Sequence, residues 1–119
     1  METEDTYVLF NRGLELMGEG QSRQAAIILE KACEQEPLKT SVREALARAL
    51  YNCGQTTRAQ EEFEKVMEQN PADHYAVFGL AMCRARLGDR VRAIGLLKIA
   101  LAMRPQSEDY LHALARLAG

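Results

Sequence analysis

The stretch PLKTSVREALARALYNCGQTTRAQEEFEKVMEQNP, residues 37–71, contains the pattern on which the fold depends. A proline stands at each end, Gly54 stands near the middle, and the helix formers Ala, Leu and Glu are common throughout. The residue before a proline is biased away from helical backbone, and a glycine permits the positive φ of a tight turn. The stretch therefore predicts two helices joined at Gly54 and separated from their neighbours by Pro37 and Pro71.

The same pattern recurs along the chain with a period of 34 residues. Four sets of residues keep this spacing: Pro37, Pro71 and Pro105; Gly20, Gly54 and Gly88; Ala25, Ala59 and Ala93; and Leu29, Phe63 and Leu97. Self-similarity at a fixed period indicates a repeat array. Because one helix pair cannot bury its apolar surface alone, we expect neighbouring pairs to stack into a superhelix.

Helix boundaries follow from the same punctuation. The first unit is expected to hold one helix at about residues 6–18 and a second helix that ends before Pro37. The side chains predicted to cap helix N-termini are Ser22, Ser41 together with Glu44, Thr56, Asp73 and Ser107. Glu108 and Asp109 follow Ser107, where their charges suit the positive end of a final helix.

Small residues are expected where the two helices of each pair cross. They are Gly13, Ala47 and Ala81 on the first helices, and Ala25, Ala59 and Ala93 on the second helices. Without large side chains at the crossing, two helix axes can approach to about 8–9 Å. The last helix is expected to close the stack with a buried side and a solvated side, formed by Leu111, Leu114 and Leu117, and by Asp109, His112 and Arg116.

The repeated unit resembles that of the tetratricopeptide-repeat family. This family prefers Leu, a small residue, Ala, an aromatic residue or Leu, and Pro at fixed positions of a 34-residue unit. The matching residues include Leu9, Gly13, Ala25, Leu29 and Pro37; Leu46, Ala47, Ala59, Phe63 and Pro71; and Leu80, Ala81, Ala93, Leu97 and Pro105. The departures from the family's pattern are Arg12, Arg43, Val66, Val77 and Arg84.

The resemblance implies an all-α fold, a right-handed superhelical stack of antiparallel helix pairs with three units and seven helices. It implies a single domain over residues 1–119. Within this domain the repeats are expected at about residues 6–39, 40–73 and 74–107, followed by a capping helix at about residues 108–118.

The resemblance also implies a concave groove, lined by the first helix of each pair, in which family members bind peptides. The groove residues carried over to this chain are Tyr7, Phe10, Asn11, Leu14, Met17, Arg48, Tyr51, Asn52, Tyr75, Phe78, Met82 and Arg86. Glu44 and Gly79 lie at groove positions too, and Arg116 is expected to close the groove from the final helix. The predicted surface is apolar and aromatic, with basic residues toward its C-terminal side.

One subclass of the family grips the C-terminal carboxylates of heat-shock chaperones with Lys, Asn and Arg side chains. The corresponding positions here are Phe10, Leu14, Ala45, Tyr75 and Gly79. None of these side chains can form a charge-assisted hydrogen bond to a carboxylate as the clamp does, since Tyr75 offers only a neutral hydroxyl. A chaperone-tail cofactor is therefore not expected.

Two functions of different classes remain open. The first is a non-enzymatic module that binds an amphipathic helix or peptide with apolar anchors and some acidic residues, which would meet Arg48 and Arg86. The second is a self-assembling scaffold, because residues 1–39 carry a net charge of −4 and residues 74–107 carry +5, so copies could meet head to tail. For the groove, the alternative is that some of its rings pack inside the stack.

No pattern typical of a catalytic, metal or cofactor site is found. Cys33, Cys53 and Cys83 lie far apart in the sequence and are predicted to be packed thiols within helices. His74 and His112 do not have the spacing of a metal-binding pair, and they are expected to cap a helix or face solvent. We therefore expect neither a cofactor nor an enzymatic activity.

Charged residues and the N-terminus indicate location and exclude other partners. The run Glu61, Glu62, Glu64 and Glu68 is interpreted as the solvated outer face of a helix. The acidic N-terminus lacks the features of a signal peptide, and no apolar run reaches the roughly 18 residues that span a bilayer. Overall acidity with scattered arginines disfavours nucleic acid. We expect a cytoplasmic protein without membrane or nucleic-acid partners.

Overall fold

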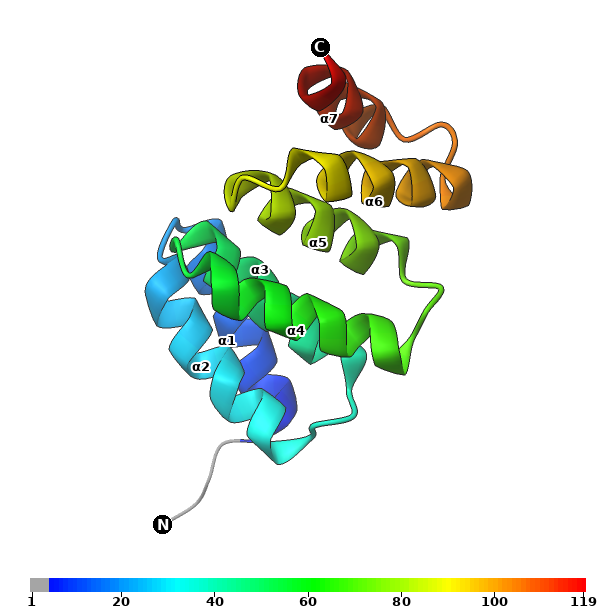
Figure 1. The fold of residues 1–119 in the computed structure, drawn as a ribbon. Helices are drawn as coiled ribbons and strands as arrows, with labels where there is room; N and C mark the ends of the chain where they lie inside the picture. Colours follow the sequence, from blue (N-terminus) through cyan, green and yellow to red (C-terminus); the bar gives the residue numbers. More distant parts are fainter. Residues whose placement is uncertain (1–4) are drawn as a thin grey trace.

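The computed structural model describes residues 5–119, so residues 1–4 of the predicted domain lie outside the described part. Residues 5–119 form seven α-helices and no strand (Figure 1): α1 (Thr6–Gly18), α2 (Ser22–Gln35), α3 (Thr40–Asn52), α4 (Thr56–Gln69), α5 (His74–Arg86), α6 (Arg90–Met103) and α7 (Glu108–Ala118). The predicted all-helical stack of three helix pairs and a closing helix is confirmed.

The helix pairs follow one another along an elongated stack. Figure 1 shows α1 and α2 at one end and α7 at the other, and the described residues extend over 54 × 25 × 23 Å. Each second helix contacts the first helix of its own pair and that of the next pair, and α3 also contacts α1 and α5. The first helices are therefore neighbours, which is the arrangement that a shared groove requires.

The turns within pairs depend on three glycines. Gly20, Gly54 and Gly88 have φ values of +78°, +88° and +91°, and no non-glycine residue among those described has a positive φ. A Cβ atom disfavours this left-handed backbone, so the periodic glycines have a steric reason. In the first turn, the Gly20 amide donates to the Met17 carbonyl at 3.0 Å and the Gln21 amide donates to the Leu16 carbonyl at 2.8 Å.

Three predicted N-caps are wrong, two of them at the glycine turns. Gln21 and Gln55 close the turns and are at the same time the N-caps of α2 and α4, so Ser22 and Thr56 fall inside the helices. Lys39 is the N-cap of α3, and no side chain caps it. The predicted capping box of Ser41 and Glu44 is therefore absent as well.

Two predicted caps are confirmed. Asp73 accepts a hydrogen bond from the Ala76 amide at 3.0 Å, and Ser107 accepts one from the Tyr110 amide at 3.3 Å. Glu108 and Asp109 lie in the first turn of α7, as expected.

The small residues predicted at the helix crossings are all buried. A Cβ built on Gly13 would lie 2.5 Å from Cγ of Leu29, so the first pair packs too closely for a side chain at residue 13. Leu29, Phe63 and Leu97 occupy equivalent positions of the second helices, and all three are almost fully buried.

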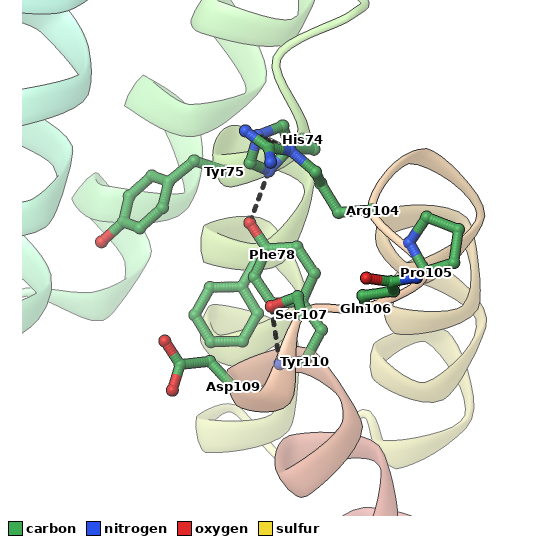
Figure 2. A pocket seen from close by; sticks show the side chains of 9 residues that line it. All are labelled: His74, Tyr75, Phe78, Arg104, Pro105, Gln106, Ser107, Asp109 and Tyr110. Atoms are coloured by element: carbon green, nitrogen blue, oxygen red, sulfur yellow. Dashed lines mark hydrogen bonds between the residues drawn. The ribbon is translucent and has the colours of Figure 1, made fainter.

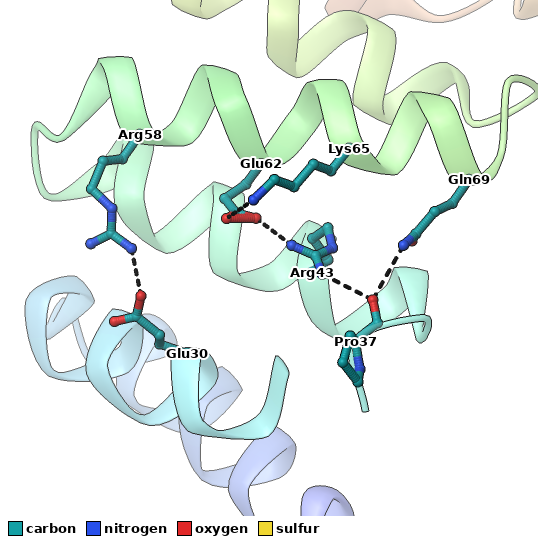
Figure 3. A network of polar contacts seen from close by, with 7 residues as sticks. All are labelled: Glu30, Pro37, Arg43, Arg58, Glu62, Lys65 and Gln69. Atoms are coloured by element: carbon teal, nitrogen blue, oxygen red, sulfur yellow. Dashed lines mark hydrogen bonds and ion pairs between the residues drawn. The ribbon is translucent and has the colours of Figure 1, made fainter. Parts of the chain in front are cut away.

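A polar network links α3 and α4 beside their apolar contacts (Figure 3). The Arg43 guanidinium lies 2.6 Å from the Glu62 carboxylate and donates to the Pro37 carbonyl at 2.9 Å. Both charged side chains are only 12% exposed. Glu62 therefore does not belong to a solvated face, as was predicted from its acidic neighbours, and Arg43 departs from the family pattern because it has this partner.

The cysteines are packed free thiols, with one difference from expectation. Cys33 and Cys83 are buried in helices, whereas Cys53 is half-buried and lies just after α3 as its C-cap. Burial raises the pKa of Cys33 and of Cys83 to about 11 in each case. These two thiols therefore stay protonated near neutral pH and are poor nucleophiles.

The closing helix α7 differs from prediction on its buried side. Tyr110 and Ala113 are buried, Leu114 and Leu117 are half-buried, and Leu111 is 46% exposed. The prediction of a buried Leu111 is wrong, because α7 packs on the stack through the face that carries Tyr110 and Ala113. The expected exposure of Asp109, His112 and Arg116 is confirmed. None of the helices in residues 5–119 combines the length and the apolar character needed to cross a membrane.

Candidate peptide-binding groove

The twelve predicted groove residues all lie on the first helices α1, α3 and α5, and none is fully buried. Tyr7 is 74% exposed, Asn52 and Arg86 are exposed, and the other nine are half-buried. Their apolar members, including Phe10, Leu14 and Tyr51, pack one side against the core. They cover the core and still offer part of their surface to a ligand.

A central hollow of about 120 Å³ lies between α3 and α5. Six predicted groove residues line it, together with Phe63 and Gly79: Arg48, Tyr51, Asn52, Tyr75, Phe78 and Met82. The repeat places them together because residues at equivalent positions of α3 and α5 face the same side of the stack. The five predicted residues of α1 do not line this hollow, and Asn11 donates its amide to the Tyr7 carbonyl at 3.1 Å.

Aromatic rings connect the central hollow to the end of the stack. The ring centroids of Phe63 and Tyr75 are 6.5 Å apart, those of Tyr75 and Phe78 are 6.1 Å apart, and those of Phe78 and Tyr110 are 4.7 Å apart. Offset and tilted ring pairs at these distances attract one another beyond simple burial. The groove therefore has a continuous row of aromatic rings from Phe63 to Tyr110.

A second hollow of about 620 Å³ lies at this end (Figure 2). It is lined by His74, Tyr75 and Phe78 of α5 and by Arg104, Pro105, Gln106, Ser107, Asp109 and Tyr110 around the start of α7. The sequence interpretation missed His74, Arg104 and Tyr110 as site residues. The repeat register indicates only that Tyr110 is buried, because it lies 34 residues after the buried Ala76. Its place in the hollow and its contact with His74 needed the structure.

Hydrogen bonds orient the polar groups of the second hollow. Arg104 Nε donates to His74 Nε2 at 3.1 Å, so this nitrogen carries no proton. The proton must then be on Nδ1, which donates to the Tyr110 hydroxyl at 2.7 Å. Burial raises the pKa of Tyr110 above its ordinary value, which keeps its own proton in place. The hydroxyl of Tyr110 can therefore donate to a carbonyl or carboxylate in the hollow.

A third hollow of about 420 Å³ lies at the other end of α5 and α7. It is lined by Tyr51, Met82, Ala85 and Arg86, and by Arg116 and Leu117 of α7. Arg116 therefore lines a hollow together with three predicted groove residues, and its role in closing the groove stays a prediction.

Arg86 has a structural role that the sequence did not indicate. Its guanidinium donates to the Tyr51 carbonyl at 2.7 Å and to the Thr56 hydroxyl at 3.3 Å, and lies 3.5 Å from the centre of the Tyr51 ring. It thus gives the Tyr51 carbonyl, which also accepts from the Gly54 amide at 3.1 Å, a second donor at the end of α3. An acidic ligand would have to compete with these contacts, so the predicted role of Arg86 in binding acids stays a prediction.

Glu44 lies at the groove, and its carboxyl keeps a proton at higher pH than an ordinary glutamate does. Burial, followed by a hydrogen bond to Asp73, raises the pKa of Glu44 to about 8, while Arg48 lowers it. Near neutral pH Glu44 and Asp73 therefore share a proton between their carboxyl groups. Arg48 also lies 6.0 Å from the centre of the Tyr75 ring, so the groove has a cation next to an aromatic wall.

Replacing Glu44 with Gln should remove a pH dependence of stability. The folded protein holds a proton that the unfolded chain releases near the ordinary pKa of 4.5, so wild-type stability falls as pH rises from there through about 8. Above that range Glu44→Gln should be more stable than wild type by about 1 kcal/mol, after allowance for partial exposure. Urea unfolding at several pH values measures this, with the exposed Glu61→Gln as control. An identical pH profile for wild type and Glu44→Gln would contradict it.

The fold and the groove define a class of protein: an array of helical repeats in which side chains of the first helices line a groove. A family model described as tetratricopeptide repeat matches residues 16–73 and 54–117. The chain belongs to the tetratricopeptide-repeat family.

Curated relatives are much longer than this chain. Superkiller complex protein 3 of Mus musculus is 34% identical over 106 residues, and its Homo sapiens counterpart is 32% identical over 106 residues. Each alignment covers 89% of this chain and 7% of the relative. The chain therefore spans a small fraction of the length of these proteins.

Solved structures share the fold over nearly the whole chain. YrrB, described as a tetratricopeptide-repeat protein with an unusual peptide-binding site, superposes with a TM-score of 0.89 at 26% identity, covering 93% of this chain and 57% of YrrB. The first tetratricopeptide-repeat domain of Spaghetti (RPAP3), bound to the HSP90 peptide SRMEEVD, superposes with a TM-score of 0.90 at 15% identity. This alignment covers 99% of this chain and 94% of that chain. The latter likeness shows the fold alone.

Proposed function

We propose that this chain is a non-enzymatic module that binds an amphipathic segment of another protein along the groove of α1, α3 and α5. The central hollow carries this proposal, because its walls are the side chains of Tyr51, Tyr75, Phe78 and Met82. Aromatic and methionine side chains suit apolar anchors of a peptide or helix, since they give large contact area at low entropic cost.

The same hollow supports an acidic residue in the ligand. Arg48 lines it, and a guanidinium can form charge-assisted hydrogen bonds to a carboxylate. In the second hollow, Arg104 and the Tyr110 hydroxyl add further hydrogen-bond donors. We therefore propose a ligand with two or more apolar anchors and at least one Asp or Glu.

Other proteins of this fold support peptide binding but do not identify the ligand. YrrB is described as having an unusual peptide-binding site, and the RPAP3 domain binds an HSP90 peptide. Phe10, Leu14, Ala45, Tyr75 and Gly79 occupy the carboxylate-clamp positions here, and Ala45 and Gly79 are also buried. We therefore propose an internal apolar segment rather than a chaperone tail as the ligand.

A charge swap at Arg48 tests this function. Peptides that bind the protein would first be selected from a random library. The acidic peptide that binds most tightly would then be compared with a version in which Lys replaces its acidic residue. Arg48→Glu should weaken binding of the acidic peptide about tenfold, because one charged hydrogen bond is worth about 1.4 kcal/mol. This variant should bind the Lys version more tightly than the acidic peptide. Arg23→Glu, an exposed change of equal charge on α2, is the control. An equal response of both variants would overturn the proposal.

The remaining sequence predictions stay proposals. We propose one domain with repeats at about residues 6–39, 40–73 and 74–107 and a closing helix at about 108–118, located in the cytoplasm. Head-to-tail self-assembly of first and third repeats remains the alternative function. One of its cations, Arg86, is held by Tyr51 and Thr56 of the same molecule, so the peptide-binding proposal is preferred.

A further inference from the structure

The outer side of α6 carries an exposed row of apolar residues. Residues three or four positions apart share one face of a helix, and on this face α6 has Val91, Gly95, Ile99 and Ala102. Val91 is 83% exposed, Ile99 is 52% exposed, and the two small residues are exposed as well. The buried side of α6 is also apolar, and a helix that is apolar all round is normally covered on every side. We call these four residues the outer stripe.

The equivalent sides of α2 and α4 are mainly polar. Two repeats earlier the corresponding residues are Arg23, Ile27, Lys31 and Glu34, and one repeat earlier they are Thr57, Glu61, Lys65 and Glu68. All of them are exposed, although a further helix pair follows α2 and another follows α4. A following pair therefore leaves this side of a second helix uncovered. The exposure of the outer stripe does not depend on what comes after α7.

Gly95, in the middle of the outer stripe, has no role inside the fold. Its φ is not positive, and a Cβ built on it would meet nothing within 4 Å. A glycine inside a helix costs roughly 0.5–1 kcal/mol relative to alanine. This cost is explained if a second helix crosses α6 at Gly95, because a small residue at the crossing lets two helix axes approach to about 8–9 Å.

We propose that the outer stripe binds an acidic amphipathic α-helix that is not part of residues 5–119, and that this helix crosses α6 at Gly95. The site is separate from the groove. None of the four residues of the outer stripe lines the central, second or third hollow.

The charges beside the outer stripe determine the charge of the helix that it binds. At the helical period Lys98 lies about 60° to one side of Gly95 and Arg92 lies about 60° to the other. Both side chains are exposed, and α6 contains no acidic residue. Asp89 lies 3.6 Å from Arg92, but an ion pair as exposed as this one contributes little. A helix with acidic residues along both edges of its apolar side is therefore complementary to the outer stripe.

The same charges disfavour a second copy of this chain as the occupant. Whether two α6 helices ran parallel or antiparallel, a contact across the outer stripe would bring Arg92 and Lys98 of one copy beside the same two residues of the other. Like charges in such a contact oppose association. The outer sides of α2 and α4 do not suit the stripe either, because Ile27 is their one large apolar residue.

A designed helical peptide provides the probe. It has alanine at its centre, leucine one turn to either side, and glutamate along both edges of this apolar side, and a lactam bridge on the opposite side keeps it helical. The control peptide has lysine in place of each glutamate. Fluorescence anisotropy with the labelled peptides should show saturable binding of the acidic peptide and binding of the basic peptide that is weaker by about tenfold or more.

Variants of the protein locate the binding. Ile99→Glu should weaken binding of the acidic peptide by about tenfold or more, whereas Ile27→Glu, at a similarly exposed isoleucine on the outer side of α2, should leave it unchanged. Gly95→Leu should weaken binding to a similar extent because its side chain blocks the close approach. Since leucine favours a helix more than glycine does, this variant should melt no lower than wild type, so a folding defect would not explain the loss. Arg92→Glu combined with Lys98→Glu should reverse the preference to the basic peptide.

Four outcomes would overturn the proposal. They are the absence of saturable binding, binding that survives Ile99→Glu or Gly95→Leu, a dimer of the protein alone that Ile99→Glu dissociates, and cosedimentation with phosphatidylserine vesicles that Ile99→Glu abolishes. The third outcome would identify a second copy as the occupant, and the fourth a membrane surface. Ile99→Glu should leave binding of the peptide selected on the groove unchanged, so the two sites are tested separately.

Discussion

Replacing Tyr75 and Phe78 together with Ala is expected to abolish measurable binding of the peptide selected on the groove. Both side chains line the central and the second hollow, so both anchoring regions lose a wall at once. Truncation of an aromatic hot spot costs about 2 kcal/mol or more, and the two losses together correspond to roughly a thousandfold in affinity. Isothermal titration calorimetry against the wild type measures the change.

The control must account for stability, because both rings also support the fold. Phe78 stacks on Tyr110, and Tyr75 packs against the core, so the double variant should melt at a lower temperature. Leu96→Ala removes a comparable half-buried side chain on α6 that lines none of the three hollows. If the double variant is folded at the assay temperature and still binds within threefold of wild type, the groove is not the binding site.

Gly79→Ala is expected to destabilise the protein by about 2 kcal/mol, although alanine usually favours a helix. A Cβ at residue 79 would lie 2.4 Å from Cζ and 2.5 Å from Cε1 of Phe63, whose ring is buried. Overpacking costs typically about 1–3 kcal/mol, which outweighs the gain of roughly 0.5–1 kcal/mol from replacing a helical glycine. Urea unfolding measures the difference.

Two further variants test whether contact with Phe63 causes the loss of stability in Gly79→Ala. Gly95→Ala lies on α6 with nothing within 4 Å of its Cβ, so it should stabilise slightly. Phe63→Leu combined with Gly79→Ala reproduces the leucine–alanine pairs of the other interfaces, Leu29 with Ala45 and Leu97 with Ala113. The double variant should therefore be at least about 1 kcal/mol more stable than the sum of the single changes predicts. Strict additivity would contradict a direct contact between residues 63 and 79.

Local rules made the architecture predictable from the sequence. Gly20, Gly54 and Gly88 have the positive φ that only glycine adopts readily, and Pro37 and Pro71 stand just beyond the ends of α2 and α4. Such residues act through their own backbone, so their effect can be read without knowing what surrounds them. The same holds for Asp73 and Ser107, which cap the helices that directly follow them.

Contacts between helices could not be predicted from such local rules. Glu62 has acidic neighbours in sequence but pairs with Arg43 across the helix pair, and Arg86 looked like a groove cation but holds Tyr51. Ser22 and Thr56 fail as caps because the preceding turns use Gln21 and Gln55 in their place.

The sequence by itself determined the periodic elements of this protein: helix pairs, their turns, and which helices face the groove. Tertiary structure alone decided which groove residues meet in hollows, how His74, Arg104 and Tyr110 share their hydrogen bonds, and that Leu111 remains exposed. The physical reason is the distance along the sequence over which each effect acts. Backbone preference and helical period act within a few residues, whereas the burial and pairing of a side chain depend on residues on other helices, such as Glu62 for Arg43 and Tyr110 for His74, that only the packed stack brings near.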